Sequence, residues 1–211
     1  LLAHFPCGSA ADAADAVSAA VAAYPAWAAT PWPERVRILL RAAELIEQRV
    51  YDVSAAVALE IGKNRMEALG EVQETADLVR WYCEQMQAND GFDRGLPDDP
   101  LPGFRSHNRA RLRPYGAWAV IAPFNFPFAL AGGPIGAALV AGNAVLAKPA
   151  ETTPLIAARA VELLHLAGVP ADVLQLMPGS GAKVGRALTA DPRIAGVCFT
   201  GSLSTAKAID N

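Results

Sequence analysis

The stretch Trp118-Ala119-Val120-Ile121-Ala122-Pro123-Phe124-Asn125-Phe126-Pro127 joins an apolar run to an Ala- and Gly-rich segment, and it decides the fold class. Residues 118–121 are all apolar, which is typical of a short strand buried on both faces of a parallel sheet. Pro123 ends the strand because it has no amide hydrogen to donate, and Pro127 can open a helix in its first turn. Asn125 is thereby expected at the carboxyl end of a strand, where open α/β sheets bind ligands.

The amide of Asn125 is a candidate oxyanion donor. It carries no charge of its own, so it can stabilise the negative charge that develops on a carbonyl oxygen. Taken by itself, an asparagine in this setting is more often a turn residue that tolerates an unusual backbone conformation. The segments that follow favour the functional interpretation.

Residues 143–154 repeat the pattern of apolar strand, proline stop and helix start. Lys148 marks the end of the strand, and Thr152 or Thr153 can cap the helix that follows. A lysine and a glutamate three residues apart, Lys148 and Glu151, can hydrogen-bond the hydroxyls of a ribose. The alternative is an exposed ion pair that contributes little.

Two further strand-and-loop units follow. Residues 173–176 lead into the glycine-rich segment 178–185, which suits a phosphate but matches the dinucleotide fingerprint poorly in spacing. Residues 196–199 lead into Thr200-Gly201-Ser202, whose free amides and Ser202 hydroxyl can meet a pyrophosphate. An ordinary serine cap is the alternative for Ser202.

Strands that alternate with helices of roughly ten to fifteen residues predict βαβ units, and hence an α/β, Rossmann-like, mostly parallel sheet with flanking helices. Helical periodicity predicts an amino-terminal helical segment with helices over about 9–28, from Pro31 onward, over 52–61 and over 65–88. On the last of these, Glu71, Glu74 and Asp77 are predicted to form a solvated face. The expected division is 1–90 for the helical part of the nucleotide-binding domain, 91–113 for a loop or hairpin, and 114–211 for the core.

Glycine and proline crowd between residues 89 and 108, so that region is expected to have the least regular structure. The alternating residues 110–113 predict an edge strand, and a plain linker is the alternative. The apolar residues 126–141 are too few to span a bilayer comfortably and predict a buried helix packed on the sheet.

Composition favours a globular enzyme with a sizeable core, since 53% of the 211 residues are hydrophobic and the formal net charge is -3. Neither nucleic acid nor membrane is expected as a partner. The three histidines lie far apart and predict no metal site. Three widely spaced cysteines, Cys7, Cys83 and Cys198, suit a reducing, cytoplasmic compartment. Leu1 is not an initiator methionine, so we expect the start to be trimmed.

In order and spacing these segments resemble the aldehyde dehydrogenase superfamily. The segments that carry the resemblance are Phe124-Asn125-Phe126-Pro127, Gly142-Asn143 with Lys148-Pro149-Ala150-Glu151, Pro178-Gly179-Ser180-Gly181 and Phe199-Thr200-Gly201-Ser202. Within this superfamily, the chain is most similar to the subgroup of L-glutamate γ-semialdehyde (1-pyrroline-5-carboxylate) dehydrogenases. The segments that indicate this subgroup are Gly62-Lys63, Glu67-Ala68 and Gly70-Glu71-Val72. The chain departs from many relatives in carrying Phe124 where they carry tryptophan.

The resemblance implies NAD as the cofactor and a role for each matching residue. Asn125 would donate to the oxyanion, Phe126 would line the substrate channel, and Glu71 would contact the substrate's amino group. Lys148 and Glu151 would bind the adenosine ribose. The remaining cofactor contacts would be Ile121, Pro123, Phe124, Ala150, Gly181, Phe199, Thr200, Gly201 and, at the pyrophosphate, Ser202.

The implied reaction is the NAD-dependent oxidation of an aldehyde to a carboxylate, here L-glutamate γ-semialdehyde to L-glutamate in proline catabolism. In this family a cysteine thiolate attacks the aldehyde and a glutamate activates water. Both are expected beyond Asn211, so this chain alone is predicted to be inactive. The resemblance also implies an oligomerisation hairpin within residues 91–113, and the intact enzyme is expected to be a homo-oligomer. The alternatives are an aldehyde dehydrogenase with another substrate or an acyl-CoA product, a non-catalytic nucleotide-binding module, and an apolar interaction domain with no ligand.

Overall fold

The computed structural model describes residues 2–210 and shows an α/β fold with a four-stranded parallel sheet, which confirms the predicted fold class. The helices are α1 (Ala10–Ala29), α2 (Trp32–Gln48), α3 (Val50–Ile61), α4 (Arg65–Ala88), α5 (Ala129–Ala141), α6 (Pro154–Ala167), α7 (Arg186–Ala190) and α8 (Leu203–Asp210). The strands are β1 (Asp93–Gly95), β2 (Arg109–Arg111), β3 (Ala117–Ile121), β4 (Ala144–Lys148), β5 (Leu174–Leu176) and β6 (Ile194–Phe199).

The parallel sheet has the order β5-β4-β3-β6, the order of one half of a Rossmann fold extended by one strand. Its register pairs Ile121 of β3 with Lys148 of β4 on one side and with Phe199 of β6 on the other. The carboxyl ends of these three strands therefore lie level, and the loops that follow them begin at one edge of the sheet.

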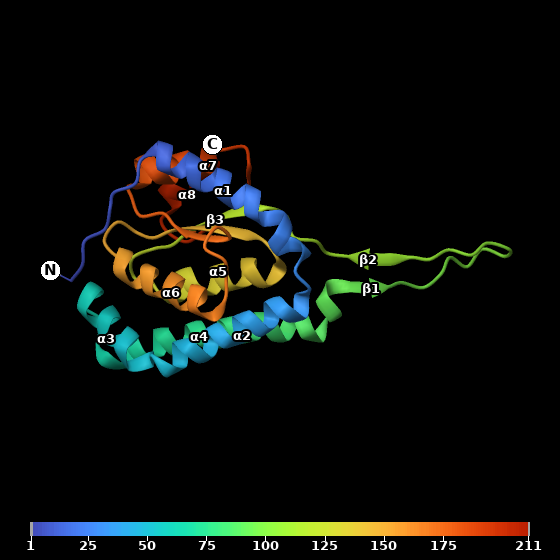
Figure 1. The fold of residues 1–211 in the computed structure, drawn as a ribbon, viewed down its shortest axis with the longest axis horizontal. Coiled ribbons are helices and arrows are strands. Elements are labelled where there is room, and N and C mark those ends of the chain that lie inside the picture. Colours follow the sequence, from blue (N-terminus) through green and yellow to red (C-terminus); the bar gives the residue numbers. More distant parts are fainter. Residues whose placement is uncertain (1, 211) are drawn as a thin grey trace.

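Helices cover both faces of the sheet (Figure 1). α1 and α7 pack on one face, α5 and α6 pack on the other, and α2, α3 and α4 form an outer layer against α5 and α6. The strands are apolar on both faces because both faces are covered: every residue of β4 is buried. The predicted amino-terminal helices are thus confirmed, and they form α1 and the outer layer.

α5 approaches α4 closely. A Cβ added to Gly132 would lie 2.5 Å from Cγ2 of Thr75, so only glycine lets the two helices come this near. The sequence predicts that this helix packs on the sheet, and the structure adds that its glycine face meets α4. It also corrects the start of the helix, which is Ala129 and not Pro127.

β1 and β2 form an antiparallel hairpin that projects from the body of the molecule (Figure 1). The carboxylate of Asp93 accepts hydrogen bonds from both Arg109 and Arg111, and these bonds lower the pKa of Asp93, that from Arg109 most. The strand predicted at 110–113 lies at 109–111, and it pairs with 93–95 inside the region 91–113 that was expected to hold a loop or hairpin.

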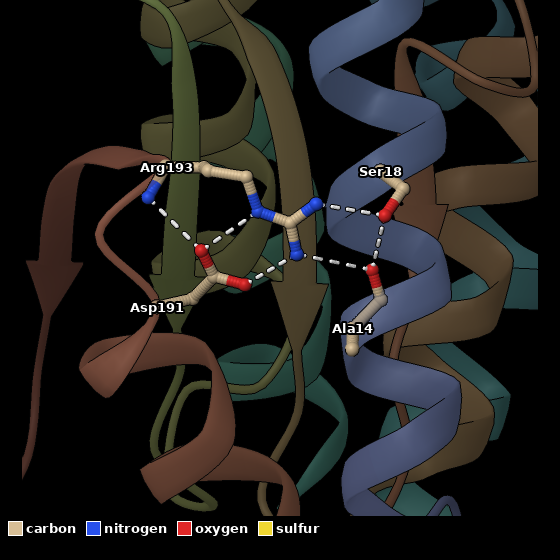
Figure 2. Close-up of polar contacts among 4 residues, drawn as sticks. All are labelled: Ala14, Ser18, Asp191 and Arg193. Atoms are coloured by element: carbon tan, nitrogen blue, oxygen red, sulfur yellow. Dashed lines mark hydrogen bonds and ion pairs between the residues drawn. The ribbon is translucent and has the colours of Figure 1, made fainter.

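The turn that leads into β6 is tied to α1 by Arg193 (Figure 2). Its guanidinium donates to the carboxylate of Asp191, to Oγ of Ser18 at 2.8 Å and to the carbonyl oxygen of Ala14 at 3.4 Å. The hydrogen bonds from Arg193 lower the pKa of Asp191. Because the pair is exposed, its charge attraction contributes little; its effect is to fix where β6 begins.

Within residues 2–210, no helix is both long enough and apolar enough to cross a membrane.

Candidate functional site

Three loops meet at the carboxyl edge of the sheet. The amide of Ala122 donates to the carbonyl oxygen of Lys148, and the amide of Thr200 donates to that of Ile121, each at 3.1 Å. From β3 the sheet extends to β4 on one side and to β6 on the other, so the tips of β3 and β6 border a topological switch point. Open α/β sheets bind their ligands in the crevice at such a point.

The loop after β3, residues 122–128, is referred to below as the oxyanion loop. Asn125 is exposed, and its side-chain amide forms no hydrogen bond within residues 2–210. Phe124 and Phe126 are 63% and 40% exposed, although aromatic side chains at a protein surface are usually more covered. The amide of Asn125 can therefore donate a hydrogen bond to the oxygen of a ligand, while the exposed rings of Phe124 and Phe126 contact the ligand's apolar part.

The segment after β4, residues 148–153, is referred to below as the ribose loop. Lys148 is 5% exposed, and its Nζ donates to the carbonyl oxygen of Pro149 at 2.9 Å. Burial lowers the pKa of Lys148, and the nearby charge of Glu151 opposes that effect. An ammonium has three donors, so Lys148 keeps donors that ribose hydroxyls or an anion can accept.

Glu151 connects the ribose loop to the glycine-rich segment. Its Oε1 accepts a hydrogen bond of 2.9 Å from the amide of Gly181, while the residue remains exposed. The structure thus brings Gly181 to the motif that contains Lys148 and Glu151, and the sequence had selected these as two separate motifs. Gly181 begins a single π-helical turn, Gly181–Gly185, in which Ser180 caps the amide of Lys183.

The loop after β6 leads into α8. Oγ of Ser202 accepts a hydrogen bond of 3.2 Å from the amide of Thr205, so the cap interpretation of Ser202 is correct. An amino end of a helix is also where phosphate binds best, and Ser202 is exposed there. A Cβ added to Gly201 would lie 2.5 Å from Cζ of Phe199, so a larger residue would require that ring to move.

Glu71 is not on a solvated face, contrary to the sequence prediction. Its side chain is 0% exposed and forms an ion pair of 2.6 Å with Nζ of Lys63. Its Oε1 accepts hydrogen bonds from the amides of Phe128 and Ala129. Because the side chain is fully buried, a direct contact with a substrate amino group would require the residues around Glu71 to move.

Two residues of this region were not identified as functional from the sequence. Lys63 lies with Nζ 3.3 Å from the ring centroid of Phe126, and Glu60 accepts hydrogen bonds from Leu155 and Ile156 at the start of α6. The predicted helix start is correct, since Thr153 is the N-cap residue and Pro154 the first residue of α6, but the side chain of Thr153 makes no cap hydrogen bond. The only local signal for Glu60 was its position near the end of α3, two residues before Gly62.

The buried thiols of the chain are poor nucleophiles. Burial raises the pKa of Cys83 to about 12, and it also raises the pKa of the half-buried Cys198. A protonated thiol does not attack a carbonyl carbon readily. Cys7 is exposed and precedes Gly8, whose amide donates a hydrogen bond to the carbonyl oxygen of Pro178. Pro178 follows β5, and β4 lies between β5 and β3.

A model of the aldehyde dehydrogenase family matches residues 1–211, and the chain belongs to that family. The bifunctional protein PutA of Klebsiella aerogenes is 46% identical over 182 residues, which are 86% of this chain and 13% of that protein. The 1-pyrroline-5-carboxylate dehydrogenase of Anoxybacillus flavithermus (strain DSM 21510 / WK1) is 43% identical over 176 residues, 83% of this chain and 33% of that protein. The chain therefore spans a third or less of the length of these relatives.

Solved structures agree with this assignment. A crystal structure of bifunctional proline utilization A (PutA) superposes with a TM-score of 0.92 at 42% identity, covering 98% of this chain and 21% of that one. The NADP-dependent glyceraldehyde-3-phosphate dehydrogenase from Bacillus halodurans C-125, complexed with NADP, gives a TM-score of 0.89 at 32% identity, with 98% and 43% covered.

Proposed function

We propose that this chain is the nucleotide-binding part of an enzyme that oxidises L-glutamate γ-semialdehyde to L-glutamate with NAD. The observation that carries the proposal is the free amide of Asn125 on the oxyanion loop, beside the switch point of a parallel sheet. The choice of aldehyde is supported by relatives at 42–46% identity that are named 1-pyrroline-5-carboxylate dehydrogenase or PutA. 1-Pyrroline-5-carboxylate is the cyclic form of this semialdehyde.

The residues of the edge fit a dinucleotide. Lys148 and Glu151 offer a donor and an acceptor to the two ribose hydroxyls, and Ser202 with the first amides of α8 suits the pyrophosphate. The other proposed contacts with NAD come from residues that border the same edge of the sheet: Ile121, Pro123, Phe124, Ala150, Phe199, Thr200 and Gly201. When bound, NAD accepts a hydride from the substrate carbon.

The part of this chain in the chemistry is to hold the aldehyde oxygen. Nδ2 of Asn125 donates to that oxygen as negative charge develops on it, and the donor is most effective where water is excluded. Phe126 contacts the aliphatic stem of the substrate. The nucleophile and the base come from residues outside these 211.

A panel of aldehydes tests the substrate assignment. The intact enzyme is expected to give its highest kcat/KM with L-glutamate γ-semialdehyde, and a value at least about tenfold lower with an aldehyde of equal length that lacks the amino and carboxyl groups. Kinetics under saturating NAD provide the measurement. An equal or higher kcat/KM for the plain aldehyde would contradict the assignment and favour a member with another substrate.

NAD is expected to be used at least about tenfold more efficiently than NADP. The carboxylate of Glu151 is held by the amide of Gly181 next to the proposed ribose site, and it would repel a 2′-phosphate. Measuring kcat/KM for both cofactors checks this. In Glu151→Gln, the ratio of kcat/KM for NAD to kcat/KM for NADP should move closer to one. A preference for NADP in the wild-type enzyme would exclude the ribose role of Glu151.

The β1–β2 hairpin supplies a surface for a second copy of the chain. Leu96, Leu101 and Phe104 are 42–62% exposed on this projecting segment, and apolar side chains gathered at such a tip favour a protein contact. Replacing residues 96–108 with a two-residue Asn-Gly turn should lower the molecular mass of the intact enzyme in analytical ultracentrifugation. An unchanged mass would mean that the segment is a plain linker.

A further inference from the structure

Two glutamates on either side of the turn between α3 and α4 each reach the amino end of a distant helix. Residues Glu60 to Glu71 comprise the end of α3, the turn and the first two turns of α4, and they are called the α3–α4 corner below. Glu60 reaches α6 and Glu71 reaches α5. These two helices begin directly after the ribose loop and the oxyanion loop.

Glu71 supplies the cap that α5 lacks. Phe128, the N-cap residue of α5, has no side chain that can accept a hydrogen bond. Oε1 of Glu71 accepts instead from the amides of Phe128 at 2.8 Å and Ala129 at 3.3 Å. A buried carboxylate is also favoured by the partial positive charge at the start of a helix.

Lys63 ties the same carboxylate to the oxyanion loop. Its ammonium lies 2.6 Å from Oε2 of Glu71 and 3.3 Å from the ring centroid of Phe126, the residue after Asn125. An ammonium over an aromatic face is attracted by the ring, most strongly where both are shielded from water. The corner therefore holds the loop at its end, through Phe128, and beside Asn125, through Phe126.

Glu60 does the equivalent for α6. Its Oε1 accepts from the amide of Leu155 at 2.9 Å and its Oε2 from that of Ile156 at 3.0 Å. The hydroxyl of Thr153, the N-cap residue, is buried and has no partner within residues 2–210. Burial raises the pKa of Glu60, and the two amide donors oppose that rise.

We propose that the α3–α4 corner positions the two loops of the site independently, Glu71 with Lys63 acting on the oxyanion loop and Glu60 on the ribose loop. This rests on the proposed function, which gives the two loops their roles. Glu60 and Glu71 are positioning residues, since each acts through backbone amides of a loop end. Because both lie on one corner, they also fix how far Asn125 is from the ribose-binding pair.

Single alanine variants of the intact enzyme separate the two effects. Glu71→Ala is expected to lower kcat about ten- to hundredfold, because a donor displaced by about 1 Å loses much of its effect. The Kd for NAD should stay within about twofold, because the NAD contacts proposed on this loop precede Asn125, whereas Glu71 and Lys63 act on residues 126–129. Glu60→Ala is expected to raise the Kd for NAD about five- to tenfold and to leave kcat at saturating NAD within about twofold. Glu71→Gln can keep one oxygen for the amides of Phe128 and Ala129 but loses the ion pair with Lys63, and Glu60→Gln keeps one of two acceptors, so each should recover only part of the loss.

Glu47→Ala is the matched control. Glu47 forms an ion pair with Arg80 between α2 and α4 and contacts neither loop, so its loss should change neither kcat nor the Kd for NAD. The proposal is overturned if Glu71→Ala and Glu60→Ala change the same parameter, or if both only lower Tm. If Glu71→Ala does not fold, Lys63→Met takes its place and is expected to lower kcat by a smaller factor. An unchanged kcat in Lys63→Met overturns the proposal that Glu71 and Lys63 position the oxyanion loop.

Hydrogen exchange gives a readout that needs no turnover. Glu71→Ala should speed exchange at the amides of residues 128–129 and not at 155–156, and Glu60→Ala should do the reverse. Equal acceleration at both helix starts in either variant overturns the proposal. If the wild-type enzyme oxidises no aldehyde, the proposed function fails, and this exchange pattern still decides whether the corner positions the loops.

Discussion

Replacing Asn125 with alanine is expected to lower kcat of the intact enzyme by about two to three orders of magnitude, the effect expected for one lost oxyanion donor. The affinity for NAD should barely change, because the side chain of Asn125 is not a proposed NAD contact and the ribose and pyrophosphate contacts lie on the loops after β4 and β6. Folding should also be little affected, since Asn125 is exposed and its amide forms no hydrogen bond within residues 2–210. Measurements of kcat, Kd and Tm on one preparation test all three expectations.

Asn143→Ala provides a control with the same chemical change. Oδ1 of Asn143 accepts hydrogen bonds from the amides of Tyr115 and Gly116, and the residue is 6% exposed. Its loss should lower the free energy of unfolding by about 1–3 kcal/mol and leave the turnover of folded molecules intact. If Asn125→Ala behaves in this way instead, then Asn125 only shapes its turn, and the oxyanion is held by backbone amides.

The strands and their loops could be predicted because their signals are local. An apolar run that ends at a proline needs no distant partner to be recognised, and three such runs correctly gave β3, β4 and β5 with the loops that follow them. A fourth apolar run, residues 196–199, ends at Thr200-Gly201-Ser202 and correctly gave β6. Asn125, Lys148 and Glu151 were then found by their position just after a strand. Their convergence at one edge follows from parallel strands in register.

The supports of the site could not be predicted because they depend on contacts between distant segments. Glu71 is 57 residues from Phe128, and Glu60 is 95 residues from Leu155. On its helix, Glu71 has the pattern of a solvated residue, and only its three partners explain why a carboxylate is buried there. The bounds of β1 could not be predicted for a similar reason: Asp93-Arg94-Gly95 has no strand periodicity and is defined by its pairing with β2.

The 211-residue chain alone is expected to produce no NADH from any aldehyde, even at saturating NAD. Hydride transfer requires a tetrahedral adduct with a thiolate, and the described thiols do not supply one at the tip of β3. With a pKa of about 12, only about one Cys83 thiol in 10⁵ is ionised at pH 7. Cys198 is a strand residue paired with Val120, and burial raises its pKa as well.

Cys7 is the one exposed thiol among the described residues, and its position excludes it on geometric grounds. It adjoins the segment after β5, and β4 lies between β5 and β3, so about 10 Å of sheet separates it from the oxyanion loop. The assay compares the chain with the intact enzyme at equal concentration, using absorbance of NADH. NADH formed in proportion to the concentration of the chain would contradict the prediction, and Cys7→Ser would then show whether Cys7 is the source.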